Sequence, residues 1–221
     1  MKYDSIFDVI GHIMVGPSSS HTAGACRIAY VTYQLLGDIP TQAEIILLGS
    51  FSETYKGHGT DKAIVAGLLG FKPDDERIRK AFFFAEEKGM KFKIKKGDLG
   101  GDFHPNSVLL HVKKGSKKIE VIGSSIGGGN IIIIEIDGYE AGFNTDLPTL
   151  VVVHKDLPGI ISKITSVIAK HKINIDSMKL TKNIRKREAL TWIEINSTIS
   201  EELSSEIEKL ENVKLVRVLN V

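Results

Sequence analysis

The chain has 221 residues, of which 42% are hydrophobic and 25% are charged, and these ordinary globular values allow one or two domains. A net charge of +2 creates no long-range positive field, so no nucleic-acid partner is expected. No apolar stretch approaches the roughly 18 residues of a membrane span. Asp4 and Asp8 interrupt the N-terminal apolar residues where a secretory signal would need them, so we expect a cytoplasmic protein.

The first half of the chain is predicted to fold as a mixed α/β domain. Apolar residues spaced by three and four, with polar caps, indicate helices over residues 5–14, 21–36, 60–69 and 74–88. Runs of alternating or buried apolar residues indicate strands over residues 44–50, 91–96, 107–113, 117–122, 130–136 and 139–143. The glycine-bearing stretch from 51 to 59 is expected to be a loop, with Thr60 as the cap of the next helix.

The composition changes at residues 144–148, a short polar segment that ends in proline and suits a domain boundary. Beyond it we predict strand, helix, strand, strand, helix and strand over residues 149–154, 158–171, 174–182, 188–197, 200–210 and 213–218. This βαββαβ order is that of the ferredoxin-like fold. The sequence therefore predicts an α+β protein with domains at 1–143 and 149–221, joined by a linker at 144–148.

Two motifs in the first domain are not explained by core packing: G-P-S-S-S-H-T-A-G at residues 16–24 and G-H-G-T-D-K-A at residues 57–63. Each lies at the start of a predicted helix and contains a histidine, His21 or His58. Hydroxyl groups and free backbone amides at a helix N-terminus can bind a carboxylate, and a histidine can move a proton. Either motif alone is also explained by helix capping beside a loop histidine. Two of them in one domain favour a shared site.

The segments V-V-V-H-K-D-L-P-G-I-I-S-K-I, at 151–164, and H-K-I-N-I-D-S-M, at 171–178, closely resemble an ACT domain, the small-molecule regulatory module of amino-acid metabolism. The resemblance implies an effector site made of a strand-to-helix turn and the opening of the next strand. Its residues would be Asp156, Leu157, Pro158, Gly159, Asn174 and Ile175. A glycine at a helix N-terminus lets a carboxylate ligand approach the backbone. The alternative is that this turn only caps a helix.

The two N-terminal motifs, with H-P-N at 104–106 and S-I-G-G-G at 125–129, resemble the beta subunit of bacterial iron–sulfur-dependent L-serine dehydratase over the whole chain. The resemblance implies an N-terminal domain similar to the allosteric substrate-binding domain of phosphoglycerate dehydrogenase. It also implies a separate alpha subunit with a [4Fe-4S] cluster, and conversion of L-serine to pyruvate and ammonium by the two subunits together. The single cysteine, Cys26, agrees with this division because a cluster normally takes three or four cysteine ligands.

By the same resemblance, His58 is expected to be the catalytic residue nearest the reacting atoms, oriented by Thr60 and Asp61. The residues expected to bind the substrate are Ser18, Ser19, Ser20, His21, Thr22, Thr60 and Asp61. No residue of this chain is expected to bind a metal, and the ACT domain is expected to self-associate. The alternative function is a non-catalytic regulatory subunit that senses an amino acid for another enzyme.

Overall fold

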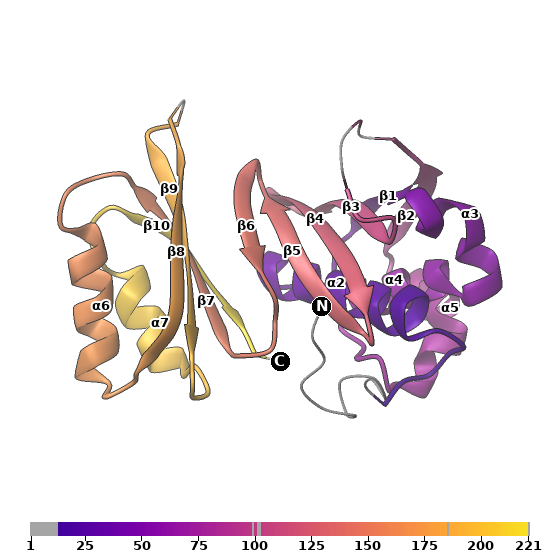
Figure 1. Cartoon of the computed structure of the whole chain (residues 1–221), viewed down its shortest axis with the longest axis horizontal. Helices are drawn as coiled ribbons and strands as arrows, with labels where there is room; N and C mark the ends of the chain where they lie inside the picture. The colour runs from indigo at the N-terminus through magenta and orange to yellow at the C-terminus, as the bar shows by residue number, and fades with distance from the viewer. Residues whose placement is uncertain (1–12, 99, 101–102, 185, 221) are drawn as a thin grey trace. The chain divides into compact units, whose positions relative to one another are not determined.

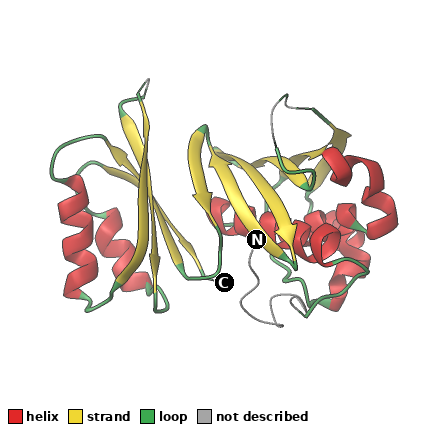
Figure 2. Ribbon diagram, in the orientation of Figure 1, coloured by secondary structure: helices red, strands yellow, loops and turns green. Residues whose placement is uncertain are grey.

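In the computed structural model the chain forms two compact units, Met1–Asp137 and Gly138–Val221 (Figure 1). The structure describes residues 13–98, 100, 103–184 and 186–220. The helix predicted at 5–14 therefore lies almost wholly outside the described residues. Each unit contains strands covered by helices on one face (Figure 2).

The sheet of the first unit combines one parallel pair of strands with antiparallel neighbours. Its strands run in the order β2-β1-β3-β4-β5, with β1 and β2 parallel and the other neighbouring pairs antiparallel. The bounds are β1 Gln42–Leu48, β2 Lys91–Lys96, β3 Ser107–Lys114, β4 Lys117–Gly127 and β5 Asn130–Ile136. Ala43, Ile45 and Leu47 alternate along β1 and are buried, so one face of this strand lies in the core.

Helices α2 (Ala25–Leu36) and α4 (Thr60–Leu68) form the layer behind this sheet. α2 packs on β3 and β4, and α4 packs on α2. A Cβ atom at Gly67 of α4 would lie 2.3 Å from the carbonyl oxygen of Cys26, so glycine is required at this crossing. The other helical segments are the π-helix η1 Ser19–Gly24, α3 Gly49–His58, the 3₁₀-helix η2 Glu76–Lys80, and α5 Ala81–Glu87.

Two of the predicted helices are each found as two segments. The helix predicted at 21–36 begins as the π turn η1 and continues as α2. The helix predicted at 74–88 is divided into η2 and α5, because Lys80, the last residue of η2, has φ −116° and ψ 25°, outside the helical region.

The prediction of a loop at 51–59 is wrong, because these residues lie in helix α3 and the turn after it. The segment is polar and contains glycines, which weakens the helical pattern, but Phe51 is fully buried and anchors the helix. Gly49 and Gly59, with φ of +50° and +67°, turn the chain at its two ends. The strand before the helix therefore ends at Leu48.

The second unit contains the βαββαβ fold that the sequence predicts. Its antiparallel sheet has the order β10-β7-β9-β8, and helices α6 and α7 cover one face (Figure 2). The bounds are β7 Thr149–Lys155, α6 Ile160–Lys170, β8 Ile175–Asn183, β9 Glu188–Ile195, α7 Glu201–Glu208 and β10 Val213–Leu219. Leu150, Ile164, Ile193 and Leu203 are fully buried between the sheet and the helices.

Strand β6 (Tyr139–Phe143) belongs to the second unit. Trp192 Nε1 of β9 donates a hydrogen bond to the carbonyl of Ala141 at 2.8 Å. The rings of Phe143 and Trp192 lie 5.6 Å apart. The domain boundary predicted at 144–148 stays a prediction.

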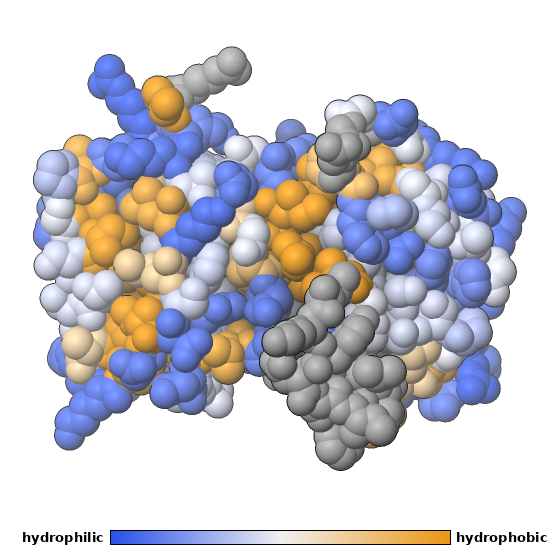
Figure 3. Space-filling view, in the orientation of Figure 1, coloured by the Kyte–Doolittle hydropathy of each residue, from blue (hydrophilic) through white to orange (hydrophobic). Residues whose placement is uncertain are grey.

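The strand β5 carries apolar residues on both faces. Ile131 and Ile133 are buried, whereas Ile132 and Ile134 are partly exposed, and Figure 3 shows an apolar patch over this strand. A continuous apolar run has no two-residue period, so its sequence does not indicate which face lies in the core. None of the helices in the described part of the chain combines the length and apolarity needed to cross a bilayer.

Candidate active site

The motif at 16–24 contains the π turn η1, which carries His21. Serine hydroxyls from η1 and from α3 contact the two ring nitrogens of this histidine. Ser18 caps the turn, and its Oγ accepts a hydrogen bond from the His21 backbone N–H at 3.1 Å. Ring Nδ1 of His21 lies 3.1 Å from Ser20 Oγ, and ring Nε2 lies 3.0 Å from Ser50 Oγ in the first turn of α3. Both ring nitrogens therefore have a hydroxyl partner. π turns are rare in proteins, and those that occur are often found at functional sites.

His58, the last residue of α3, lies against His21. The two ring centroids are 4.8 Å apart and the ring planes are tilted by 40°. The buried Thr22 hydroxyl donates a hydrogen bond to the His58 carbonyl at 2.9 Å, which ties the second motif to the first, while Ser19 is half-buried in the same turn. Nδ1 of His58 is buried and has no hydrogen-bond partner within the described residues. The structure thus brings the two motif histidines together.

The surroundings of His21 favour its neutral form. Partial burial lowers the pKa of His21, and the neighbouring His58 lowers it further. Two charged rings at this distance repel each other, so protonation of one histidine opposes protonation of the other. A neutral imidazole has one donor and one acceptor nitrogen, and a serine hydroxyl can serve as either partner. Ser20 and Ser50 can therefore satisfy either tautomer of His21.

Thr60 and Asp61 lie in the first turn of α4. Thr60 is fully buried and its hydroxyl has no hydrogen-bond partner among the described residues, and Gly59 rather than Thr60 caps α4. Asp61 Oδ1 accepts a hydrogen bond from the Lys62 N–H at 2.8 Å. Within the described part of the chain, no hydrogen bond joins either residue to His58, which is instead held by its backbone and by the ring of His21.

The S-I-G-G-G segment lies behind η1. Ser125 is fully buried, its Oγ has no partner in the described structure, and a Cβ atom at Gly24 would lie 2.1 Å from that oxygen. Arg27 Nη1 donates a hydrogen bond to the Gly129 carbonyl at 3.0 Å, which fixes the glycine turn to α2. The Ser125 N–H donates to the carbonyl of Asn106 at 2.9 Å. The motifs at 57–63 and 125–129 therefore contact η1, and the H-P-N motif contacts Ser125.

A cleft of about 320 Å³ opens beside the first turn of α3. It adjoins the histidine pair because Gly49, in its wall, directly precedes Ser50. His104, from the H-P-N motif, also lines it, and its Nδ1 accepts a hydrogen bond from the Asn106 N–H at 3.2 Å.

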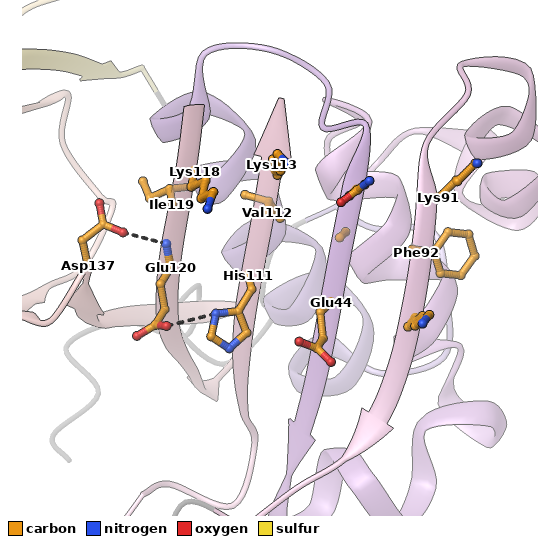
Figure 4. A pocket seen from close by; sticks show the side chains of 13 residues that line it. Glu44, Lys91, Phe92, His111, Val112, Lys113, Lys118, Ile119, Glu120 and Asp137 are labelled. Carbon is orange, nitrogen blue, oxygen red and sulfur yellow. Dashed lines mark hydrogen bonds and ion pairs between the residues drawn. The ribbon is translucent and has the colours of Figure 1, made fainter. Parts of the chain in front are cut away.

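A second cleft, of about 650 Å³, lies at the opposite end of β1 (Figure 4). His111 is paired in register with Glu44 and Glu120 on its two neighbouring strands, and its Nδ1 lies 3.0 Å from Glu120 Oε2. The Glu120 N–H donates to Asp137 Oδ1 at 2.8 Å. The lysines that line the cleft are Lys91, Lys93, Lys113 and Lys118. Because Glu44 lies near the start of β1 and Ser50 follows its end, this cleft is separate from the histidine pair.

Comparison with known proteins identifies the family. Residues 5–81 match the family model of the serine dehydratase beta chain, and residues 150–214 match that of the AHAS small subunit-like ACT domain. The L-serine dehydratase beta chain of Peptoniphilus asaccharolyticus is 40% identical to this chain over 218 residues, which is 98% of each protein. The chain belongs to the serine dehydratase beta chain family.

Two relatives of this beta chain are longer proteins. L-serine dehydratase 1 of Escherichia coli (strain K12) is 32% identical over 174 residues, which cover 65% of this chain and 37% of that protein. D-3-phosphoglycerate dehydrogenase of Methanocaldococcus jannaschii is 25% identical over 134 residues, which cover 61% of this chain and 25% of that protein. The predicted similarity to phosphoglycerate dehydrogenase is confirmed, and it is weak.

The ACT domain of this beta chain holds the predicted effector residues in two separate places. The turn from Asp156 to Gly159 precedes α6, whereas Asn174 follows it, and a helix of 11 residues rises by about 16 Å. Asp156 Oδ2 forms an ion pair with Lys182 Nζ at 2.9 Å. A cleft of about 360 Å³ is lined by Asn174 and Ile175 but not by the turn. One chain therefore does not assemble the whole predicted set.

The cysteine of this beta chain does not suit a cluster ligand. Cys26 is fully buried, its Sγ–H donates to the carbonyl of Phe71 at 3.4 Å, and burial raises the pKa of its thiol. Clusters are held by thiolates. Among the described residues, no group of three or more His, Cys, Asp and Glu side chains could hold a metal ion. The residues present therefore do not fit an iron–sulfur cluster.

Sequence reasoning missed Ser50 as part of the site. It was predicted as the last residue of the strand at 44–50, and a position at the end of a strand does not predict a contact between its side chain and His21. Gly49 before it is the available signal, because a glycine directly after an apolar run often marks a sharp turn out of a strand.

Proposed function

We propose that this chain is the beta subunit of an L-serine dehydratase, which with an alpha subunit converts L-serine to pyruvate and ammonium. The observation that carries the proposal is the contact between His21 and His58, each supplied by one of the two family motifs. The Peptoniphilus relative, an L-serine dehydratase beta chain similar to this chain over 98% of its length, supports L-serine as the substrate.

In the proposed reaction, His58 takes the α-proton of L-serine at Nε2. Its other ring nitrogen, Nδ1, is buried, so Nε2 is the atom left to face a substrate. Loss of the α-proton and of the β-hydroxyl gives aminoacrylate and water, and hydrolysis of the imine tautomer of aminoacrylate then gives pyruvate and ammonium. A positioned general base typically contributes 10²- to 10⁴-fold to the rate.

The serine-rich turn is proposed to bind the polar groups of the substrate. Each hydroxyl of Ser18, Ser19 and Ser20 offers one donor and two acceptor positions, so the contacts to His21 leave capacity for a ligand. The hydroxyl of Thr60, within the second motif, is buried and has no partner in the described structure, so small motions on binding would bring it into contact with the substrate. Thr22 and Asp61 are already engaged within the chain and support the turn and the start of α4.

The alpha subunit is proposed to carry the [4Fe-4S] cluster. The buried Cys26 supports this division, because this chain offers no thiolate for a cluster. The length of the E. coli relative also supports it, since the similar region covers 37% of that protein and leaves room for a second part. We place the complex in the cytoplasm, where thiols are kept reduced.

The ACT domain is proposed to pair with that of a second copy and to bind a small amino acid at the seam. The separation of the turn at Asp156 to Gly159 from Asn174 supports a site shared by two chains. L-serine is the effector that the proposed substrate suggests. Coupling between such sites is typically worth 5- to 150-fold in affinity.

Co-expression with the candidate alpha chain under anaerobic conditions, followed by a pyruvate assay, tests the proposal. The complex should form pyruvate from L-serine, and the isolated beta chain should show neither iron absorption nor activity. A complex that binds an amino acid but forms no pyruvate would favour the alternative, a non-catalytic regulatory subunit.

A further inference from the structure

Ser50 is the partner of His21 that comes from outside the motif at 16–24. Its Oγ lies 3.0 Å from His21 Nε2. The backbone of Ser50 serves α3, because its carbonyl accepts a hydrogen bond from the Thr54 hydroxyl at 3.0 Å. No side chain caps the N-terminus of this helix, so the Ser50 hydroxyl is not used to begin it.

The backbone holds Ser50 in this position. At Gly49, which has a φ of +50°, a Cβ atom would lie 2.5 Å from the carbonyl oxygen of Pro105. Phe51, on the other side of Ser50, is fully buried and its ring lies edge-on to that of His21, with 5.4 Å between centroids. Since both neighbours are fixed, Ser50 has little freedom to leave His21.

We propose that Ser50 is a positioning residue that acts through His21 on His58. Ser50 and Ser20 hold the His21 ring at its two nitrogens, and the held ring supports the ring of His58. His58 Nδ1 has no partner of its own in the described structure, so ring contact with His21 restricts its rotation. This inference rests on the proposed role of His58 as the base.

In the described part of the chain, the groups that face His21 come from its own turn and from α3. Its own turn presents the hydroxyls of Ser18 and Ser20, and α3 presents Ser50, Phe51 and His58. His58 is the titratable group among these. A change at Ser50 should therefore appear in the titration of His21.

Nuclear magnetic resonance of the full beta chain, labelled at histidine, tests the contact directly. Ser50→Ala should raise the titration midpoint of His21 by about 0.5 unit or more, because a hydroxyl partner of the neutral ring is lost and water reaches Nε2. Ser50→Thr keeps the hydroxyl and should keep the midpoint. Ser52→Ala is the matched control, because Ser52 lies on the same helix and donates to the Gly49 carbonyl at 2.7 Å instead.

Kinetics of the assembled complex test the consequence. Ser50→Ala should lower kcat about tenfold or more through misplacement of His58, with KM changed less than about twofold. Ser50→Thr should restore most of kcat, and Ser52→Ala should match the wild type. If Ser50→Ala fails to fold, Ser50→Cys, which is similar in size and only a weak hydrogen-bonding group, takes its place.

An unchanged His21 midpoint in Ser50→Ala, or a kcat equal to that of Ser52→Ala, overturns the proposal. A wild-type complex that forms no pyruvate instead rejects the proposed function. The resonance titration does not depend on activity, so it still decides whether Ser50 holds His21.

Discussion

The ring of His21 lies 4.8 Å from the ring of His58, although one residue comes from the turn before α2 and the other ends α3. Serine hydroxyls occupy both nitrogens of the first ring, whereas Nδ1 of the second has no partner in the described chain. A general base needs a nitrogen that is free to gain a proton. Both ring nitrogens of His21 are engaged, so His21 does not meet this condition, whereas Nε2 of His58 is the nitrogen proposed to face the substrate.

Substitution of His58 should act on turnover. His58→Ala is expected to lower kcat of the assembled enzyme by roughly 10²-fold or more, as for the loss of general-base help. His111→Ala, in the cleft at the other end of β1, is the histidine control and should leave kcat near the wild-type value. Wild-type turnover in His58→Ala would remove His58 from the site.

The stability of the first unit should depend on pH through His21. Its pKa is lower in the folded chain than the ordinary value of about 6.5, so the unfolded chain takes up the proton first as the pH falls. Stability is therefore greatest above about pH 6.5 and declines as the pH falls from there toward the lowered pKa. Urea midpoints at about pH 7.5 and 5.5 should fall less in His21→Asn than in the wild type. Equal declines would contradict the lowered pKa.

Two glycines of α3 should respond in opposite ways to alanine. Gly49→Ala places a Cβ atom 2.5 Å from the Pro105 carbonyl oxygen at a positive φ, and should destabilise the chain by about 2 kcal/mol or more. Gly57 lies in the same helix, and a Cβ atom there would meet nothing within 4 Å. Gly57→Ala should therefore be neutral, or stabilise the chain by up to about 1 kcal/mol. Denaturant midpoints of the two variants measure this. Similar midpoints for both would show that Gly49 is not confined by Pro105.

Complementation between two variants can test the shared effector site. Asp156→Ala and Asn174→Ala chains should each fail to bind L-serine, because every site at the seam lacks one half. A mixed dimer has one intact site, so calorimetry on the mixture should recover binding at reduced stoichiometry. Ser162→Ala, exposed on α6, is the control and should bind as the wild type. A mixture that stays inactive in binding would place the two residues outside a common site.

The packing of β6 on β9 can be followed through the single tryptophan. Trp192 is 7% exposed and donates to the carbonyl of Ala141, so a fragment of residues 138–221 should keep it shielded. A fragment of residues 149–221 lacks β6 and should show red-shifted emission and a lower melting temperature. Equal emission in the two fragments would show that β6 does not cover this ring.

The sequence was sufficient to predict secondary structure where the period of the apolar residues agrees with the helix caps and turn residues at the ends of the elements. The βαββαβ order of the second unit follows from strands and helices of contrasting period, bounded by Pro148, Gly159 and Ser200. Helix α4 was found for the same reason. Its cap was predicted at Thr60, one residue too late. Gly59, in the left-handed conformation, caps the helix instead, and a threonine side chain can also fill that position.

The sequence was not sufficient to predict the structure where contacts between distant segments determine it. Helix α3 is anchored by one buried ring, Phe51, among polar residues, and no local pattern reveals this. Strand β6 follows β5 after a short turn, and its hydrogen bond to Trp192 joins it to a residue far along the chain. The contact between Ser50 and His21 likewise depends on how α3 leaves the sheet.

The π geometry of η1 makes the length of this turn part of the site. A π turn holds one more residue than an α turn, so deletion of one residue between Ser18 and His21 would let the helix close with ordinary α-helical hydrogen bonds. Such a deletion rotates the residues before it by about 100° about the helix axis while α2 keeps its packing. The serines would then leave the ring of His21. A homologue with a one-residue gap here is therefore expected to keep the fold but to lose the contacts between the serine hydroxyls and the ring of His21. This holds even if it retains the serines and the histidine.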